Sequence, residues 1–156
     1  MHPASPVRLR PALREDVATI VRLLADDGLG AGREVIADPP PGAYFDAFEE
    51  ILINPQTLLA VAEDGSGMVI GTFQMSFMRG LSNQGAKFAL VKAVRVASSV
   101  RGQGVGQAMM QWAMDEARRR GCRHIELFTH LSRTKAQRFY ERLGFEKSHA
   151  GMRRAL

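Results

Sequence analysis

The chain has 156 residues, of which 46% are hydrophobic and 24% charged, which suits one globular domain and excludes wholesale disorder. Its single cysteine excludes an intrachain disulfide and a cysteine-based zinc site, and favours a reducing cytoplasm. The longest apolar run, residues 51–62, is interrupted by Pro55, so we expect no membrane span. Residues 1–6 lack the apolar core of a secretory signal, so we expect none.

The net charge of +5 favours an anionic partner, and nucleic acid, anionic lipid and a phosphorylated cofactor all qualify. Much of the arginine lies at residues 118–120, directly before Gly121. Cations in the last turn of a helix complement its dipole, and glycine is a common C-cap, so this cluster has a structural explanation. Basic residues without interleaved exposed aromatics are a poor nucleic-acid signal. We therefore expect no nucleic-acid partner and no membrane partner.

The first third of the chain predicts one strand and two helices. Alternating residues at 7–10 predict a short strand, and apolar residues at helical spacing predict a helix over 14–28. Glycines and prolines mark 28–43 as a loop. A second helix follows over 44–54 and is stopped by a proline.

The rest of the chain predicts an antiparallel run of strands followed by one β-α-β unit. After a strand at 58–63 and a turn at 64–67, we expect a return strand with Phe73, Met75 and Phe77 on one face and Thr72, Gln74 and Ser76 on the other. A turn at 79–85, a strand at 88–96, a helix at 104–120 and a strand at 124–128 should follow. The last expected elements are a helix at 134–143 and a closing hairpin of 145–147 with 151–155. This order predicts an α/β (α+β) fold with a mixed, mostly antiparallel central sheet and helices on both faces.

The strand at 88–96 runs through a glycine-rich turn, residues 101–106, into the long helix. Such a junction presents backbone N–H groups and the positive end of a helix dipole to one point, which favours a phosphate or pyrophosphate ligand. The nucleoside-triphosphate loop G-x-x-x-x-G-K-[ST] does not occur. The dinucleotide fingerprint G-x-G-x-x-G also fails, because its third glycine would fall at Gln107 or Met109.

The turn does fit the pattern [RQ]-x-x-G-x-[GA], and a second motif follows about 30 residues later at 134–145, similar to A-x-x-[FL]-Y-x-x-x-G-F. On these two motifs the chain resembles the GNAT superfamily of N-acetyltransferases. The resemblance is sharp from about 90 to 145. It implies one GNAT-like acetyltransferase domain over 1–156, with two splayed parallel strands in the sheet.

The resemblance also implies acetyl-CoA as cosubstrate, with no metal. In the family the pantetheine arm lies against the first splayed strand, and the amides of the turn hold the pyrophosphate. Arginine stands at 133, where the family often has an asparagine that contacts the cofactor. The cofactor-binding residues assigned in this way are Val94, Arg95, Val96, Arg101, Gly102, Gln103, Gly104, Val105, Gly106, Gln107, Arg133 and Tyr140.

Tyr140 aligns with the general acid of the family, which protonates the departing thiolate of coenzyme A. A phenol with a pKa of about 10 carries its proton at neutral pH and can supply it. The alternative is an aromatic side chain packed beside Phe139.

Lys92 is the second catalytic candidate, because it stands where many relatives carry the glutamate that reaches the incoming amine. If buried, it would give up its proton more easily and would act as a base, pair with an acid or replace a lost function. A solvated lysine is the alternative, and water, Glu63 or a weakly basic acceptor would then serve. The period of two places Lys92 on one face with Phe88, Leu90, Val94 and Val96.

We therefore expect a cytoplasmic enzyme that acetylates a primary amine by direct attack on the thioester, with a small-molecule acceptor favoured. The alternatives are acetylation of a protein N-terminus or lysine, and a catalytically silent acyl-CoA-binding or regulatory module. Many relatives form homodimers. Acceptor contacts are expected from the loop at 28–43, from Tyr44 and Phe45, and from the turn at 79–85.

Overall fold

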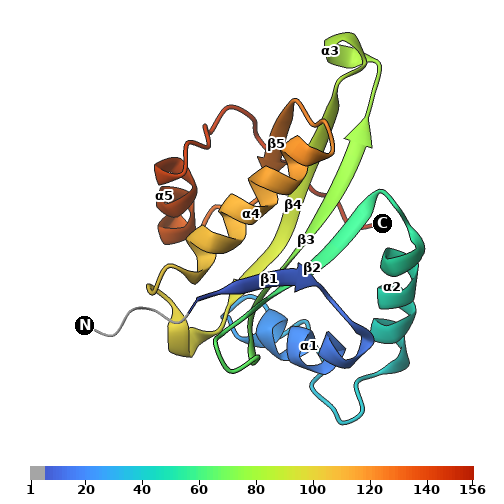
Figure 1. Cartoon of the computed structure of the whole chain (residues 1–156), viewed down its shortest axis with the longest axis vertical. Helices are drawn as coiled ribbons and strands as arrows, with labels where there is room; N and C mark the ends of the chain where they lie inside the picture. Colours follow the sequence, from blue (N-terminus) through green and yellow to red (C-terminus); the bar gives the residue numbers. More distant parts are fainter. Residues whose placement is uncertain (1–5) are drawn as a thin grey trace. The chain divides into compact units, whose positions relative to one another are not determined.

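The computed structural model describes residues 6–156 and divides into two compact units, one ending at Glu126 and one spanning Leu127–Leu156, each described by itself (Figure 1). The first unit contains β1 (Arg8–Pro11), a 3-10 turn η1 (Arg14–Asp16), α1 (Val17–Ala25), α2 (Gly42–Ile53), β2 (Thr57–Glu63), β3 (Val69–Arg79), α3 (Ser82–Gly85), β4 (Lys87–Val96), a 3-10 turn η2 (Ser98–Val100), α4 (Val105–Arg119) and β5 (His124–Leu127), which ends at the boundary. The second unit contains α5 (Thr134–Arg142).

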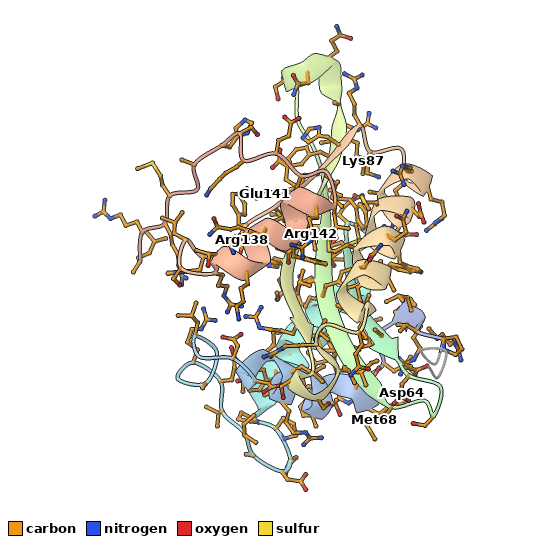
Figure 2. The ribbon with its side chains drawn as sticks, turned by 90° about the vertical axis from the view of Figure 1, so that its left-hand side faces the viewer. Asp64, Met68, Lys87, Arg138, Glu141 and Arg142 are labelled. Atoms are coloured by element: carbon orange, nitrogen blue, oxygen red, sulfur yellow. The ribbon has the colours of Figure 1, made fainter. Side chains whose placement is uncertain are left out.

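The five strands form one sheet in the order β1-β2-β3-β4-β5. The first three pairs are antiparallel and β4–β5 is parallel, so the predicted mixed sheet is confirmed. The predicted turn at 64–67 joins β2 to β3. Its geometry is fixed by Asp64, whose carboxylate accepts N–H bonds from Ser66 at 2.8 Å and Met68 at 3.0 Å (Figure 2).

The alternation predicted for β3 separates two faces of the sheet. Phe73, Met75 and Phe77 are buried on the face that α4 covers, while Thr72 and Gln74 face α1 and α2 (Figure 1). The ring of Trp112 on α4 packs edge-on against Phe73, with centroids 6.0 Å apart. Trp112 is therefore a core residue, as its helical spacing predicts.

The predicted helices are present, with shifted ends. α1 buries Val17, Ile20 and Val21 against the sheet but ends at Ala25, three residues before Gly28. α4 ends as predicted, because the N–H of Gly121 donates to Arg118 and that of Cys122 to Ala117, both at 2.9 Å. These two bonds satisfy carbonyls that would otherwise lack partners at the helix end.

The second unit confirms the amphipathic helix predicted at 134–143. Arg138, Glu141 and Arg142 are exposed on α5, while Phe139 and Tyr140 are half-buried (Figure 2). The helix ends at Arg142, and Gly144 directly after the C-cap has a φ of +91°, which is readily adopted only by glycine.

The closing hairpin predicted for 145–147 and 151–155 is wrong, because neither segment is a strand. These residues are mostly charged, small or polar, and the apolar Met152 and Leu156 are exposed. A pair of such short strands buries too little apolar surface to persist.

Candidate active site

A β-bulge interrupts β4 in its second half. Thr72 pairs with Arg95 but Gln74 pairs with Lys92, so Phe73 alone faces both Ala93 and Val94. Ala93 has a φ of +54°, in the left-handed region, which costs a residue with a Cβ roughly 1–2 kcal/mol. The surrounding sheet therefore holds a conformation that this residue would not adopt on its own.

The bulge corrects the predicted face of Lys92. Before the bulge, Lys92 shares the α1–α2 face with Phe88 and Leu90, as expected. The inserted residue then reverses the alternation, so Val94 and Val96 point to the opposite face.

The neighbouring strand β5 does not extend along the second half of β4. The N–H of Arg123 donates to the carbonyl of Lys87 at 2.8 Å, which starts the four-residue β5 at the beginning of β4. A parallel strand of that length ends before the bulge. β5 therefore lies along the first half of β4, and beyond it the carbonyls of Val94 and Val96 accept hydrogen bonds from the side chains of Arg95 at 2.9 Å and Arg101 at 3.0 Å.

The glycine turn leads from β4 into α4. Gly102 and Gly104 have φ of +79° and +85°, and nothing lies within 4 Å of a Cβ built on either. Both are exposed, and so are Arg101, Gln103 and Gln107, whereas Val105 is buried under the first turn of α4 and Gly106 is half-buried. Among residues 6–156, no hydrogen bond uses the backbone N–H groups of 102–107. The partial positive charges of these amides are not offset by hydrogen-bond acceptors among the described residues, which suits a pyrophosphate ligand.

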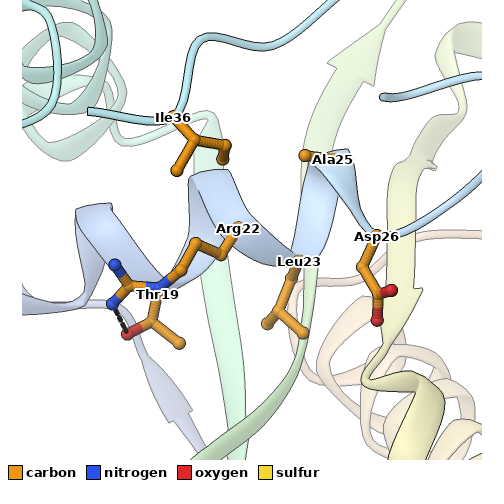
Figure 3. A pocket seen from close by; sticks show the side chains of 6 residues that line it. All are labelled: Thr19, Arg22, Leu23, Ala25, Asp26 and Ile36. Atoms are coloured by element: carbon orange, nitrogen blue, oxygen red, sulfur yellow. Dashed lines mark hydrogen bonds between the residues drawn. The ribbon is translucent and has the colours of Figure 1, made fainter. Parts of the chain in front are cut away.

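Two aspartates at the end of α1 hold the approach to this turn. The carboxylate of Asp26 accepts the N–H of Ser98 at 2.9 Å, and Arg101 donates to the carbonyls of Asp26 at 2.5 Å and Val96 at 3.0 Å. Asp26 is visible beside the last turn of α1 in a surface hollow of about 370 Å³ that Thr19, Arg22, Leu23, Ala25 and Ile36 also line (Figure 3).

The neighbouring Asp27 pairs with Arg95 at 2.6 Å, and both side chains are largely buried. The sequence analysis did not select Asp26 or Asp27. Acidic residues at the C-terminal end of a helix oppose its dipole, and this unfavourable placement was the available sign that they have other partners.

The condition for Lys92 to act as a base is not met, since its side chain is exposed. Glu63 is not available as a base either, because its carboxylate forms an ion pair of 2.6 Å with Arg10. Arg10 also pairs with the carboxylate of Asp16, at 2.6 Å. The solvated alternative for Lys92 is therefore the one that the structure supports, and water or a weakly basic acceptor remains for deprotonation.

A cavity of about 190 Å³ lies on the α1–α2 face and reaches β4 at the bulge. Of the residues expected to contact an acceptor, Tyr44 lines it, whereas the turn at 79–85 does not. Gln74, which the sequence analysis did not select, lies opposite Lys92 in the register. The lining consists of Val17, Ile20, Val21, Leu24, Tyr44, Ala47, Phe48, Ile51, Leu59, Thr72, Gln74 and Ala93.

Tyr140 and Arg133 lie in the second unit, where the motif at 134–145 has a clear structural role. Phe145 donates its N–H to the carbonyl of Tyr140 at 3.1 Å, and the two rings pack edge-on with centroids 5.9 Å apart. Phe139 packs against the other side of the Tyr140 ring at 5.1 Å. Arg133 is the N-cap of α5 and accepts the N–H of Gln137 at 3.0 Å. The Gly-Phe pair thus fixes the orientation of Tyr140 on its own helix.

Among residues 6–156, the remaining nucleophilic and metal-binding side chains form no second site. Burial raises the pKa of the Cys122 thiol, against an opposing effect of Lys87 and Arg120, so the reactive thiolate is disfavoured. In the part of the chain that the structure describes, no group of three or more His, Cys, Asp and Glu side chains gathers as metal ligands. Over those same residues, no helix combines the length and apolar character needed to cross a membrane.

Comparison with known proteins agrees with this geometry. Residues 22–145 match the model of the acetyltransferase (GNAT) family. The aminoalkylphosphonate N-acetyltransferase of Salmonella typhimurium is 31% identical over 114 residues, which cover 73% of each chain.

Two solved structures extend the agreement to the whole fold. The crystal structure of a transcriptional regulator from Bacillus halodurans C-125 is 40% identical, with a TM-score of 0.94 over 97% of this chain and 100% of that chain. The glucosamine-6-phosphate N-acetyltransferase of Arabidopsis thaliana is 20% identical, with a TM-score of 0.78 over 96% and 98% of the chains, and shares the fold. The chain belongs to the GNAT family of acetyltransferases and is an acetyl-CoA-dependent acyltransferase.

Proposed function

We propose that this chain transfers the acetyl group of acetyl-CoA to the primary amine of a small molecule, and that residues 1–156 act as one acetyltransferase domain. The observation that carries the proposal is the order of features along one stretch of backbone. The bulge at Ala93, the last residues of β4 and the amides of 102–107, which have no hydrogen bond within residues 6–156, follow one another within fifteen residues. Thioester, pantetheine arm and pyrophosphate occur in that same order along acetyl-CoA.

In this proposal the backbone of Val94, Arg95 and Val96 bonds the pantetheine arm as an added strand would. The amides from Arg101 to Gln107 hold the pyrophosphate, and an N–H of β4 polarises the acetyl carbonyl. The side chain of Arg101 is turned back to Asp26, which supports a role for its backbone rather than its charge. Arg133 supplies a further cofactor contact.

The reaction is a direct displacement. The amine nitrogen attacks the thioester carbon, a C–N bond forms and the C–S bond breaks, and the departing thiolate takes the hydroxyl proton of Tyr140. The nitrogen loses its surplus proton to water. The contacts of the Tyr140 ring with Phe139 and Phe145 support this role, because a general acid needs a fixed orientation.

Lys92 replaces the missing glutamate through its charge. Lys92 lies opposite Gln74 in the register, on the same face of the sheet as the cavity. A neighbouring cation disfavours the protonated form of an acceptor amine and so increases the neutral fraction that can attack. An exposed charge exerts this effect weakly, which suits an auxiliary function.

Two relatives suggest other partners. The Salmonella relative is named for aminoalkylphosphonates, so these compounds belong among the acceptors to be tested. The Bacillus halodurans structure is that of a transcriptional regulator. Many arginines here are already paired with acids, which leaves less charge for a nucleic-acid backbone. The arginines with such partners are Arg10, Arg14, Arg95, Arg101, Arg118, Arg119 and Arg120.

The proposal is tested with the purified chain in two measurements. Calorimetry with acetyl-CoA should give saturable binding, and coenzyme A release should depend on added amine from a panel that includes aminoalkylphosphonates, amino sugars, alkylamines and a lysine peptide. Binding without release from any amine supports the silent acyl-CoA-binding module instead. Absence of binding at millimolar acetyl-CoA refutes the proposal.

A further inference from the structure

The cavity on the α1–α2 face is almost entirely hydrocarbon. Its inner wall is made by Val17, Ile20 and Val21, which are buried, and α2 closes it with Phe48 and Ile51. Neither a cationic nor an anionic side chain is among its lining residues. A ligand that enters it exchanges water for apolar contacts on nearly every side.

The polar side chains of the cavity are largely committed to the protein. The hydroxyl of Thr72 donates to the carbonyl of Ala60 at 2.9 Å. That of Tyr44 donates to Glu34 at 2.9 Å and accepts the N–H of Val35 at 3.0 Å. The side-chain amide of Gln74 has no hydrogen bond to other described residues, which leaves it to meet a ligand.

The polar side chain that remains is that of Gln74, which is half-buried. The lining residue Ala93, at the bulge, is exposed, so the cavity is open beside β4, as it is at the exposed Ala47 on α2. The reacting amine must lie at this rim if the thioester lies at the bulge. The rest of the acceptor molecule then extends inward, between α1 and α2.

The geometry points to an acceptor whose primary amine is carried on a small hydrocarbon body that fills this cavity, in preference to a phosphonate, a sugar or a polyamine. This inference rests on the proposed function, and names the substrate class for the same site. A second charge on the body would lose its hydration without gaining a partner. The volume of about 190 Å³ accommodates about six groups the size of a water molecule, on a basis of about 30 Å³ each.

The experiment measures kcat/KM at saturating acetyl-CoA for the series ethylamine, butylamine, hexylamine and decylamine. Each buried methylene should raise kcat/KM about fourfold until the cavity is filled near six heavy atoms, after which the gain should stop. Butylamine should exceed 1,4-diaminobutane and an aminoalkylphosphonate of equal length by at least about tenfold.

Variants within the cavity keep the test specific. Ala47→Phe on α2 should lower kcat/KM for hexylamine at least about tenfold more than kcat/KM for ethylamine. Ala43→Phe is the matched control, because Ala43 is exposed one turn earlier on α2 and does not line the cavity. Ile20→Val, a mild change that keeps the fold, should shift the preferred chain length upward by about one carbon.

The outcomes separate this inference from the proposed function. Acetylation of amines with no dependence on chain length, or with the aminoalkylphosphonate preferred, overturns the hydrocarbon acceptor while leaving the N-acetyltransferase intact. Equal effects of Ala47→Phe and Ala43→Phe overturn the cavity as the binding site. Failure of every amine to release coenzyme A refutes the proposed function, and this inference with it.

Discussion

The carboxylate of Asp26, at the end of α1, accepts the backbone N–H of Ser98 in the turn after β4, at 2.9 Å. The two residues are 72 positions apart, and the bond ties η2, which leads into the glycine turn, to the end of the first helix. Arg101 adds a bond of 2.5 Å to the carbonyl of Asp26, whereas its ion pair with the carboxylate is longer, at 3.7 Å, and half-exposed. The hydrogen bonds therefore matter more than the ion pair.

Asp26→Ala should raise KM for acetyl-CoA about fivefold, because the loss of about 1 kcal/mol of hydrogen bonding loosens the turn. The value of kcat should change little, since Asp26 is a positioning residue. Asp26→Asn, which keeps an acceptor oxygen, should restore most of the affinity. Asp115→Ala, on the outer side of α4, is the control and should leave KM unchanged. A fall in kcat at constant KM would contradict the assignment.

Tyr140→Phe should lower kcat by about 10²-fold or more, because the thiolate then leaves without a proton from the protein. The phenylalanine ring preserves the contacts with Phe139 and Phe145, so KM for acetyl-CoA and thermal stability should be retained. Steady-state kinetics with the best amine of the panel measure both parameters. An unchanged kcat would remove Tyr140 from the reaction.

Lys92→Ala should move the alkaline rise of the pH profile of kcat/KM upward by about half a pH unit. A cation about 4 Å from an ammonium group repels it by about 1 kcal/mol in water, and by less after screening by salt. Loss of this repulsion favours the ammonium form of the acceptor and raises the pKa of its amine. Lys92→Arg keeps the charge and should keep the profile. Superimposable profiles for Lys92→Ala and the parent chain would show that the charge has no part in catalysis.

The pair of Arg10 with Asp16 should make folding stability depend on pH. Burial alone would raise the pKa of Asp16, but hydrogen bonds from Arg10 and from the N–H of Leu13 outweigh it and lower the pKa below 3.8. A lowered pKa in the folded state contributes stability at neutral pH, and that contribution is lost as the pH falls below about 4.

Asp16→Asn should therefore cost about 3 kcal/mol in free energy of unfolding at pH 7, because it leaves Arg10 incompletely paired near the core. The difference from the parent chain should shrink towards pH 2. Urea unfolding at several pH values measures it, with the exposed Asp46→Asn as control. A difference that is constant with pH would show that packing, and not charge, dominates at this position.

Local pattern predicted the elements whose causes are local. The alternation of Phe73, Met75 and Phe77, the turn at 64–67 and the glycine after α4 each follow from a few neighbouring residues, and the structure confirms them. The glycine turn was found in the same way. Its order between a strand and a helix carried the family assignment.

The parts that sequence reasoning missed depend on distant partners. Nothing in the residues around Ala93 favours a left-handed backbone, since only the paired strands impose it. The bonds of Asp26 join positions more than seventy residues apart. The predicted hairpin at the C-terminus failed for the converse reason: its local pattern lacked apolar surface to bury.

The bulge at Ala93 also divides β4 into two independently variable parts. Before it, Phe88, Leu90 and Lys92 lie on the α1–α2 face, and after it Val94 and Val96 lie on the opposite face. In the proposed function, sequence changes before the bulge would alter acceptor choice without altering the backbone that binds the cosubstrate. One scaffold of this kind can diversify its chemistry without rebuilding the segment that every member needs.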